Sequence, residues 1–350
     1  MIYDKKILIC YNEPASPYEN YLGKSVGKDE KKIDLSESEF MNTLITIEDE
    51  LKRKFNDVAS LGFNGNFVQS IDALRKIKPD IIFNFVESIE GHSNFESYVT
   101  GVFDMLEFEY TGNNTLCLGN CLNKIRTKHI LRAEGVPTPD YLEILFGAQL
   151  KNLTVNLEFP LIAKLATEDA SIGISEFSVV SNHDELIKHV EFLFSNYSQN
   201  VILEEYISGR ELNVAILGDE ILEISEISFK GLPAGLPSIV TYEAKWAAGS
   251  VYYNFSNPVC PAPLKRNIRN KIEDIAIKSF NALGCRDYGR VDIRLTDDGN
   301  PFVIEVNPNP DISLDSGFVR AASAAGLSYL ELLERLAHFV YRRINNDQKN

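Results

Sequence analysis

The pattern of apolar and polar positions changes about one third of the way along the chain. Residues 1–110 contain two short apolar runs typical of buried strands, Lys6–Tyr11 and Asp80–Val86. Between them, Ser38–Phe55 has the spacing of a helix. This alternation predicts a parallel α/β layer. Tyr18–Leu35 is rich in lysine and acidic residues, and we expect an exposed loop there.

The pattern after residue 115 predicts strands and helices of a mixed α+β kind. A helix over Asn123–Ala133 is followed by the Gly/Pro boundary "GVPTPDY". The run "FPLIAKLATEDASIGISEFSVV" from Phe159 reads as strand, loop and strand. The remaining predicted elements are strands at Val201–Glu205, Glu211–Leu217, Glu220–Phe229 and Arg290–Leu295, and helices at Asp184–Phe194, Lys265–Leu283 and Ser328–Ile344.

Composition narrows the class of protein. The 350 residues, 44% hydrophobic and 24% charged, suit a globular protein of two or three domains. Met1–Cys10 lacks the features of a signal peptide, and no stretch reaches the roughly 20 apolar residues that span a bilayer. We therefore expect a cytoplasmic protein without a membrane role. A net charge of −15 disfavours nucleic acid as a partner.

The spacing of the cysteines does not suggest a disulfide framework. There are five, an odd number, and no two form a CxxC pair. We expect reduced or buried thiols rather than disulfides or a zinc site at Cys10, Cys117, Cys121, Cys260 and Cys285.

Two acids and an amide near the C-terminus point to metal chemistry. Glu305 and Asn307 alternate in the strand-like run Phe302–Asn307, so their side chains face the same side. Asp292 lies in the preceding strand-like run. Oxygen ligands of this kind suit Mg²⁺. The alternative is three satisfied polar groups at a sheet edge, but their grouping inside apolar strands favours the metal.

Two further stretches suggest a nucleotide. Lys164 lies within the apolar run "PLIAKLA", where an ammonium needs an anion beside it. The small residues Ala170, Ser171 and Gly173 follow, and they suit a loop whose backbone N–H groups approach phosphate, although a structural ion pair is the alternative. No GxxxxGK[ST] sequence is present, which excludes a Walker-type loop.

The second stretch that suggests a bound nucleotide is "VILEEYISGREL". Backbone groups near Ile207 could pair with an adenine edge, and the Glu211 carboxylate could accept ribose hydroxyls. Taken alone, this stretch also reads as a charged strand end in solvent.

In this order, the stretches resemble the ATP-grasp superfamily and, within it, the D-alanine–D-alanine ligase-like proteins. The stretches that carry the resemblance are "EYTGNN", "LEEYISGRELNVAILGDEIL", "YEAKW", "LGCRDYGRVDIRLTDDG" and "VIEVNPNPDIS". The resemblance implies an α/β N-terminal domain over residues 1–115, a central lid domain over 116–206 and a C-terminal domain with the metal site over 207–350.

The resemblance also implies roles for individual residues. Groups that bind ATP would be Lys124 and Lys164 on the phosphates, Glu204 with the backbone of Glu205 and Ile207 on adenine, and Glu211 on ribose. Two Mg²⁺ ions, which Mn²⁺ can replace, would be held by Asp292, Glu305 and Asn307. Lys245 resembles a γ-phosphate contact on the closing loop, and Arg290 a group on the developing oxyanion.

The reaction implied is an ADP-forming ligation of a carboxylate and an amine, both small molecules such as amino acids, through an acylphosphate. The chain departs from the D-alanine enzymes at three positions: Ala170 replaces a serine, Trp246 a tyrosine and Asp311 a glycine. We therefore expect a substrate other than D-alanine.

Other substrate contacts follow less directly from the sequence. Glu13 and Glu19 are candidates for the acid that binds the first amino group, and Glu87 lies in "FVESIEGHSNFE", which replaces a His-Gly stretch of the family. Ser316 and Arg320 lie where an acceptor carboxylate could be held, although "DSGFVRAASAAG" also reads as an ordinary loop entering a helix.

Three other functions compete with this hypothesis. A small-molecule kinase shares the phosphoryl chemistry, and an ATP-binding sensor or scaffold shares the fold, although a complete set of metal ligands argues against the latter. A dinucleotide-binding fold is the weakest rival because no GxGxxG is present. Dimerisation is usual for ligases of this resemblance, so a homodimer is one expectation.

Overall fold

The computed structural model describes residues 2–25 and 35–347. Its N-terminal part is a parallel sheet in the order β2-β1-β3, formed by β1 (Lys6–Asn12), β2 (Asp57–Phe63) and β3 (Ile81–Phe85). The connecting helices are α1 (Leu35–Lys52) and α2 (Phe67–Ile77), and α3 (Phe95–Met105) follows β3. The central strand β1 is a continuous apolar run because both faces of the sheet are covered. The predicted parallel α/β layer is confirmed.

A second sheet, antiparallel, follows in the order β4-β7-β5-β6. Its strands are β4 (Tyr141–Ile144), β5 (Leu161–Leu165), β6 (Val179–Val180) and β7 (Val201–Glu205). Helix α6 (His183–Tyr197) packs on one face through Leu186, Val190 and Leu193, against Leu161, Ala163 and Leu165 of β5. Since side chains alternate along a strand, Lys164 faces away from this core.

The third sheet carries the C-terminal part in the order β11-β10-β8-β12-β13, with β9 on β8. Its strands are β8 (Arg210–Leu217), β9 (Glu220–Ile221), β10 (Ser225–Ser228), β11 (Asn257–Val259), β12 (Tyr288–Leu295) and β13 (Pro301–Asn307). Helix α9 (Arg266–Ala282) covers one face. The strand predicted over Glu220–Phe229 is interrupted at residues 222–224, which separate β9 from β10. Both β9 and β10 pair with β8, and Leu222 between them donates its N–H to the carbonyl of Ala215.

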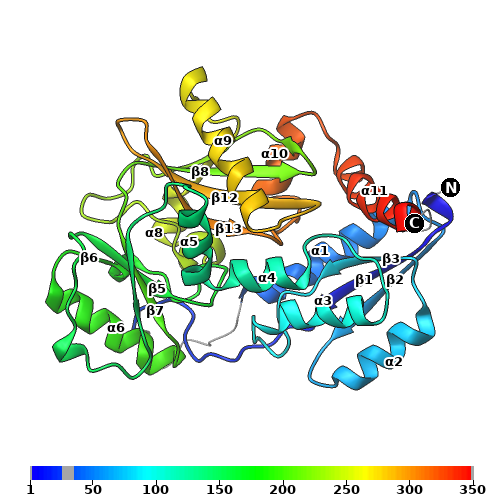
Figure 1. Cartoon of the computed structure of the whole chain (residues 1–350), viewed down its shortest axis with the longest axis horizontal. Coiled ribbons are helices and arrows are strands. Elements are labelled where there is room, and N and C mark those ends of the chain that lie inside the picture. Colours follow the sequence, from blue (N-terminus) through cyan, green and yellow to red (C-terminus); the bar gives the residue numbers. More distant parts are fainter. Residues whose placement is uncertain (1, 26–34, 348–350) are drawn as a thin grey trace.

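The remaining elements join these sheets. Helices α4 (Thr115–Leu122) and α5 (Lys124–Ala133) lead from the N-terminal part to the middle, as Figure 1 shows. Short elements are η1 (Ile2–Asp4), η2 (Leu150–Asn152), η3 (Glu176–Ser178), α7 (Tyr242–Trp246), α8 (Val251–Phe255) and α10 (Gly317–Ala324). The last helix, α11 (Tyr329–Asp347), returns to pack on α1 and β3. One hydrophobic core therefore joins the two ends of the chain. The domain boundaries after residues 115 and 206 stay predictions.

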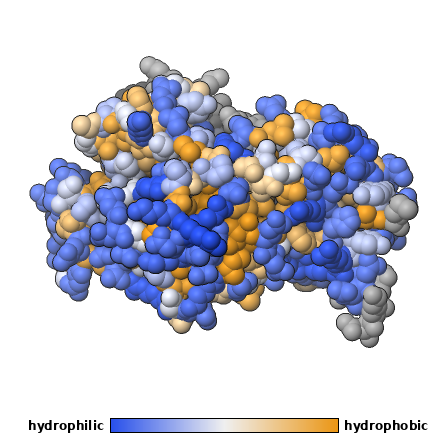
Figure 2. Space-filling model, turned by 90° about the horizontal axis from the view of Figure 1, so that it is seen from above, coloured by the Kyte–Doolittle hydropathy of each residue, from blue (hydrophilic) through white to orange (hydrophobic). Residues whose placement is uncertain are grey.

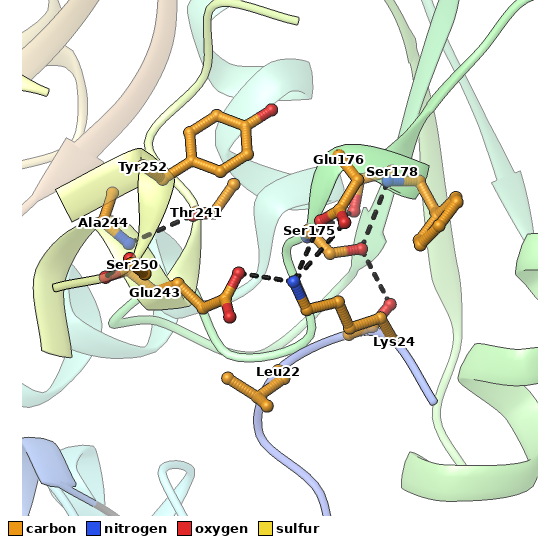
Figure 3. A network of polar contacts seen from close by, with 12 residues as sticks. Leu22, Lys24, Ser175, Glu176, Ser178, Thr241, Glu243, Ala244, Ser250 and Tyr252 are labelled. Atoms are coloured by element: carbon orange, nitrogen blue, oxygen red, sulfur yellow. Dashed lines mark hydrogen bonds and ion pairs between the residues drawn. The ribbon is translucent and has the colours of Figure 1, made fainter. Parts of the chain in front are cut away.

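The segment expected to be an exposed loop is packed where it is described, over Tyr18–Ser25. Tyr21 is 3% exposed, and the Tyr18 ring meets Tyr197 of α6 edge-on at 5.2 Å. Lys24 reaches the carboxylates of Glu243 at 2.5 Å and Glu176 at 3.4 Å (Figure 3). The polar composition misled the prediction because these charges meet partners from other segments. Residues 26–34 of the predicted loop lie outside the described residues.

The hydropathy of one face of the molecule and of its helices is consistent with the mixed hydrophobic and charged composition. Figure 2 shows a face on which hydrophilic residues dominate and hydrophobic ones gather mainly near the middle. Among the described residues, no helix combines the length and apolarity that a membrane crossing requires.

Candidate active site

The register of β12 and β13 brings the predicted metal ligands together. Asp292 lies directly opposite Glu305, and Arg290 lies opposite Asn307. Residues opposite each other in an antiparallel pair share a face, so these four side chains line the same side of the sheet. From β8, Asn213 also pairs with Asp292 and donates a 2.7 Å hydrogen bond to its carboxylate.

Cations surround the two acids. Lys124 at the start of α5 lies 3.0 Å from the Glu305 carboxylate, and the Arg290 guanidinium binds both oxygens of Asp292 at 2.7 and 2.8 Å. Burial alone would raise the pKa of Glu305, but the charges of Lys124 and Lys164 outweigh it and lower that pKa to about 2. Glu305 is therefore ionised at neutral pH.

These residues fit a hard divalent cation by their chemistry. Two carboxylates and the carboxamide oxygen of Asn307 are oxygen donors of the kind that Mg²⁺ prefers. The Asn307 oxygen accepts the N–H of Asn309 at 2.9 Å, which fixes its orientation. An ion at this position would compete with Lys124 and Arg290 for the two carboxylates.

Glu204 lies on β7 of the second sheet, between Lys164 of β5 and Lys128 of α5. Its carboxylate is 2.7 Å from Lys164 and 3.1 Å from Lys128, and its side chain is nearly inaccessible to solvent. The anion that the sequence demanded beside Lys164 is thus a protein carboxylate. Burial lowers the pKa of Lys128 to about 8 although Glu204 opposes it. Lys128 was missed in the sequence, yet it follows Lys124 by one helical turn and so shares its face.

The predicted ribose and adenine contacts lie beside a second missed residue, Arg294. Its guanidinium donates to the Glu211 carboxylate at 3.1 Å and to the Ile207 carbonyl at 2.9 Å. The N–H of Glu205 is bonded to the carbonyl of Asp140. Arg294 shares a face of β12 with Arg290 and Asp292, and this two-residue spacing was the available signal.

The small-residue loop after β5 wraps around Lys124. The ammonium of Lys124 donates to the Glu168 carbonyl at 2.5 Å and lies 3.3 Å from the Asp169 carboxylate. Ala170 and Ser171 take positive φ values of 53° and 61°, and this turns the loop sharply. From α7, Trp246 donates its indole N–H to the Ala170 carbonyl at 3.2 Å, and the exposed Lys245 lies within electrostatic range of Glu305 and Arg290.

The predicted substrate contacts fall into two groups. Ser316 caps α10 by accepting the N–H of Val319, and Arg320 donates to the Asp315 carbonyl, so both serve the local helix start. In the other group, Glu87 is exposed beside the N-terminal sheet, Glu13 accepts a 2.9 Å hydrogen bond from Asn64, and Asp311 binds the N–H and hydroxyl of Ser313.

Asp311 and Glu87 belong to an acidic part of the site that includes a third acid, Glu96, which the sequence analysis did not identify. Tyr288 donates to Asn309 at 2.7 Å, and Asn309 donates to the buried Glu96 at 3.1 Å. Burial and the charge of Glu87 raise the pKa of Glu96 well above its ordinary value. Both Asp311 and Glu87 also act electrostatically on Tyr288. The end of the site next to Arg290 is therefore rich in carboxyl groups.

Comparison with known proteins assigns the chain to a family. Residues 130–338 match the family model described as D-ala D-ala ligase C-terminus. An uncharacterized protein, y4sG, of Sinorhizobium fredii is 34% identical over 263 residues, which cover 75% of each chain. A D-alanine–D-alanine ligase of Desulforamulus reducens is 31% identical over 284 residues, covering 74% of this chain and 86% of that one.

Solved structures agree in fold. The ATP complex of the D-alanine–D-alanine ligase from Bacillus anthracis superposes with a TM-score of 0.70 at 24% identity and covers 98% of this chain and 99% of that one. The ligase from Coxiella burnetii gives a TM-score of 0.71 at 18% identity, over 99% of this chain and 97% of its own. The three sheets and the matched C-terminal half together place this chain in the D-alanine–D-alanine ligase family, with its ATP-grasp fold.

Proposed function

We propose that the protein is an ATP-dependent, ADP-forming ligase that joins a small-molecule carboxylate to an amine through an acylphosphate. The observation that carries this proposal is the pair Asp292 and Glu305, opposite in register and surrounded by cations. A site that must stabilise a migrating phosphoryl group needs both bound metal and fixed positive charge. Family membership supports the same chemistry.

Each group has a role in this proposal. Asp292, Glu305 and Asn307 would hold Mg²⁺, which when bound spreads the negative charge of the transferring phosphoryl group. Lys124 and Lys164 would bind phosphate oxygens, and both currently contact carboxylates that such an anion would replace or share. Glu204, Glu205, Ile207 and Glu211 would hold the nucleoside, Ser171 and Lys245 the γ-phosphate, and Arg290 the oxyanion of the tetrahedral intermediate.

The substrates are proposed from the charges around Arg290. Asp311 acts electrostatically on Arg290, and Glu87 and Asp311 both act on Tyr288. A second carboxylate placed there would be repelled, whereas an ammonium would be attracted. We propose an amine substrate that presents no free carboxylate to Asp311, which distinguishes this protein from a D-alanine–D-alanine ligase.

The test is phosphate release from ATP and Mg²⁺ with a pool of amino acids, which supply the carboxylate, tested alone and together with a second pool of amino-acid amides and diamines, which supply the amine. We expect more release when the two pools are combined, and a product, found by mass spectrometry, one water lighter than the carboxylate and the amine that form it. Glu305→Gln should abolish release, and the matched control Glu223→Gln, whose carboxylate pairs with Arg269 far from the site, should not.

Other outcomes would contradict the proposal. A phosphorylated product without condensation would identify a kinase instead. ATP binding without release under any pool would favour a binding protein, and release that survives in Glu305→Gln would remove the metal assignment.

A further inference from the structure

Two thiols of one helix converge in the fold with a third that lies far away in the sequence. Cys117 and Cys121 are one helical turn apart on α4, and Cys285 follows α9. Their sulfur atoms all lie within 4.8 Å of one another, and those of Cys117 and Cys285 are 3.4 Å apart. Cys117 and Cys121 are 1% and 4% exposed, and Cys285 is partly buried.

The fold holds these three positions firmly. Cys117 and Cys121 belong to the core that contains Phe280 and Leu283 at the end of α9. The N–H of Cys285 donates to the Phe280 carbonyl, which fixes the thiol at the helix end. On α4, Asn114 caps the helix by accepting the N–H of Cys117. Neither backbone segment needs to unfold for the thiols to face one point.

We propose that Cys117, Cys121 and Cys285 form a binding site for a thiophilic metal ion such as Zn²⁺. With a Zn–S bond of about 2.3 Å, sulfurs around one tetrahedral ion lie about 3.8 Å apart, a spacing that these sulfurs reach by small side-chain rotations. Asn113, whose carboxamide oxygen is 3.5 Å from the Cys117 sulfur, offers a fourth ligand beside water.

The site would connect two parts of the molecule. Helix α4 is separated from Lys124 by a single residue, Asn123, and Cys285 precedes β12, which carries Arg290 and Asp292. A bound ion would therefore tie α4 to the loop before β12 without touching the nucleotide groups. Its effect should appear in stability, because a ligand that binds only the folded state raises the free energy of unfolding.

The experiment is a titration of the fully reduced, full-length protein with Cd²⁺, a spectroscopic probe for such sites. We expect one ion per chain, an ultraviolet cadmium–thiolate band with the intensity of three thiolates, and a higher melting temperature. Cys117→Ala and Cys285→Ala should each lose one thiolate's share of the band and weaken binding at least tenfold. Cys260→Ala, at a half-buried thiol outside the cluster, is the matched control and should behave like the unaltered protein.

A second measurement needs no variant. Relative to the metal-free protein, bound Cd²⁺ should slow the alkylation of the cluster thiols, above all that of the partly buried Cys285, and leave the rate at Cys260 unchanged, as mapped by mass spectrometry. Absence of a thiolate band, or equal protection of all five cysteines, would overturn the proposal. So would a Cys117–Cys285 disulfide in protein prepared without reductant, if the reduced protein then bound no Cd²⁺.

Discussion

The indole N–H of Trp246 donates a 3.2 Å hydrogen bond to the backbone carbonyl of Ala170 and so ties α7 to the loop after β5. Neither partner uses a hydroxyl, so a relay of side-chain hydroxyls between these two positions is absent. The bond joins the loop around Lys124 to the helix that carries Lys245. We infer that it helps to hold α7 against this loop, and we call this arrangement the closed form of the site.

Removing the indole N–H should weaken this closure. In Trp246→Phe the aromatic ring remains but the hydrogen bond is lost, at a cost of about 0.5–1.5 kcal/mol. Because the proposed γ-phosphate contacts, Ser171 and Lys245, lie on the loop and the helix that this bond joins, we expect the KM for ATP to rise about 2- to 10-fold with a smaller change in kcat. Steady-state kinetics measure this, with Tyr253→Phe, an exposed ring on α8, as the control. An unchanged KM would show that the bond does not control closure.

Lys24 should support the same closure by electrostatics. Its ammonium lies between Glu176 of η3 and Glu243 of α7. Element η3 connects β5 to β6 of the second sheet, and α7 lies between β10 and β11 of the third sheet. In Lys24→Met we expect a higher KM for ATP and a weaker dependence of that KM on salt, because salt screens partly exposed pairs. Lys5→Met, which breaks a surface pair with Asp80, is the control. Equal effects of the two variants would contradict the role of Lys24.

The buried Glu204 should depend on Lys128 for stability. In Lys128→Met the carboxylate loses one of two cations in a site closed to solvent, and we expect the free energy of unfolding to fall by about 1–3 kcal/mol. Lys164→Met should cost less stability, since Lys164 is more exposed, but more ATP affinity. Urea denaturation and nucleotide titration separate the two effects. The reverse order would show that Lys128, rather than Lys164, faces the nucleotide.

His189 should make stability depend on pH. Burial against β5 lowers its pKa from 6.5 to about 4, although a hydrogen bond with the backbone of Ala163 opposes this. The folded protein keeps His189 neutral, so its contribution is complete above about pH 6.5 and is lost as the pH falls towards 4, by up to about 3 kcal/mol.

The measurement compares the unaltered protein with His189→Leu by urea denaturation across that range. As the pH falls below 6.5, the ordinary pKa of histidine, we expect the free energy of unfolding of the unaltered protein to fall relative to that of the variant. A constant difference would show that His189 does not titrate on unfolding in this way.

Asp311 should select the amine substrate. Its carboxylate acts on Arg290, and Asp311→Asn removes that charge while keeping the hydrogen-bonding shape. We expect the variant to accept amines that carry a free carboxylate and to lose preference for amides and diamines. Competition between the two pools gives the ratio of kcat/KM values, with Asp297→Asn as a distant, exposed control. An unchanged ratio would place specificity elsewhere.

Periodicity in the sequence was a good guide where one element decides the outcome. The alternation of Glu305 and Asn307 predicted a shared face, and the strand β13 has that arrangement. The apolar run around Lys164 predicted an anion beside it, and Glu204 is there. These inferences hold because strand geometry and the cost of burying charge act locally.

The sequence by itself thus predicted the parallel α/β layer at the start of the chain, the fold family and the shared face of Glu305 and Asn307. Only the tertiary structure decided that Lys128 and Arg294 neutralise Glu204 and Glu211, that Lys24 is packed, and that three thiols converge from α4 and the end of α9. The reason is physical. Local patterns fix which way a side chain points within its own element, but long-range packing chooses which other side chain it meets.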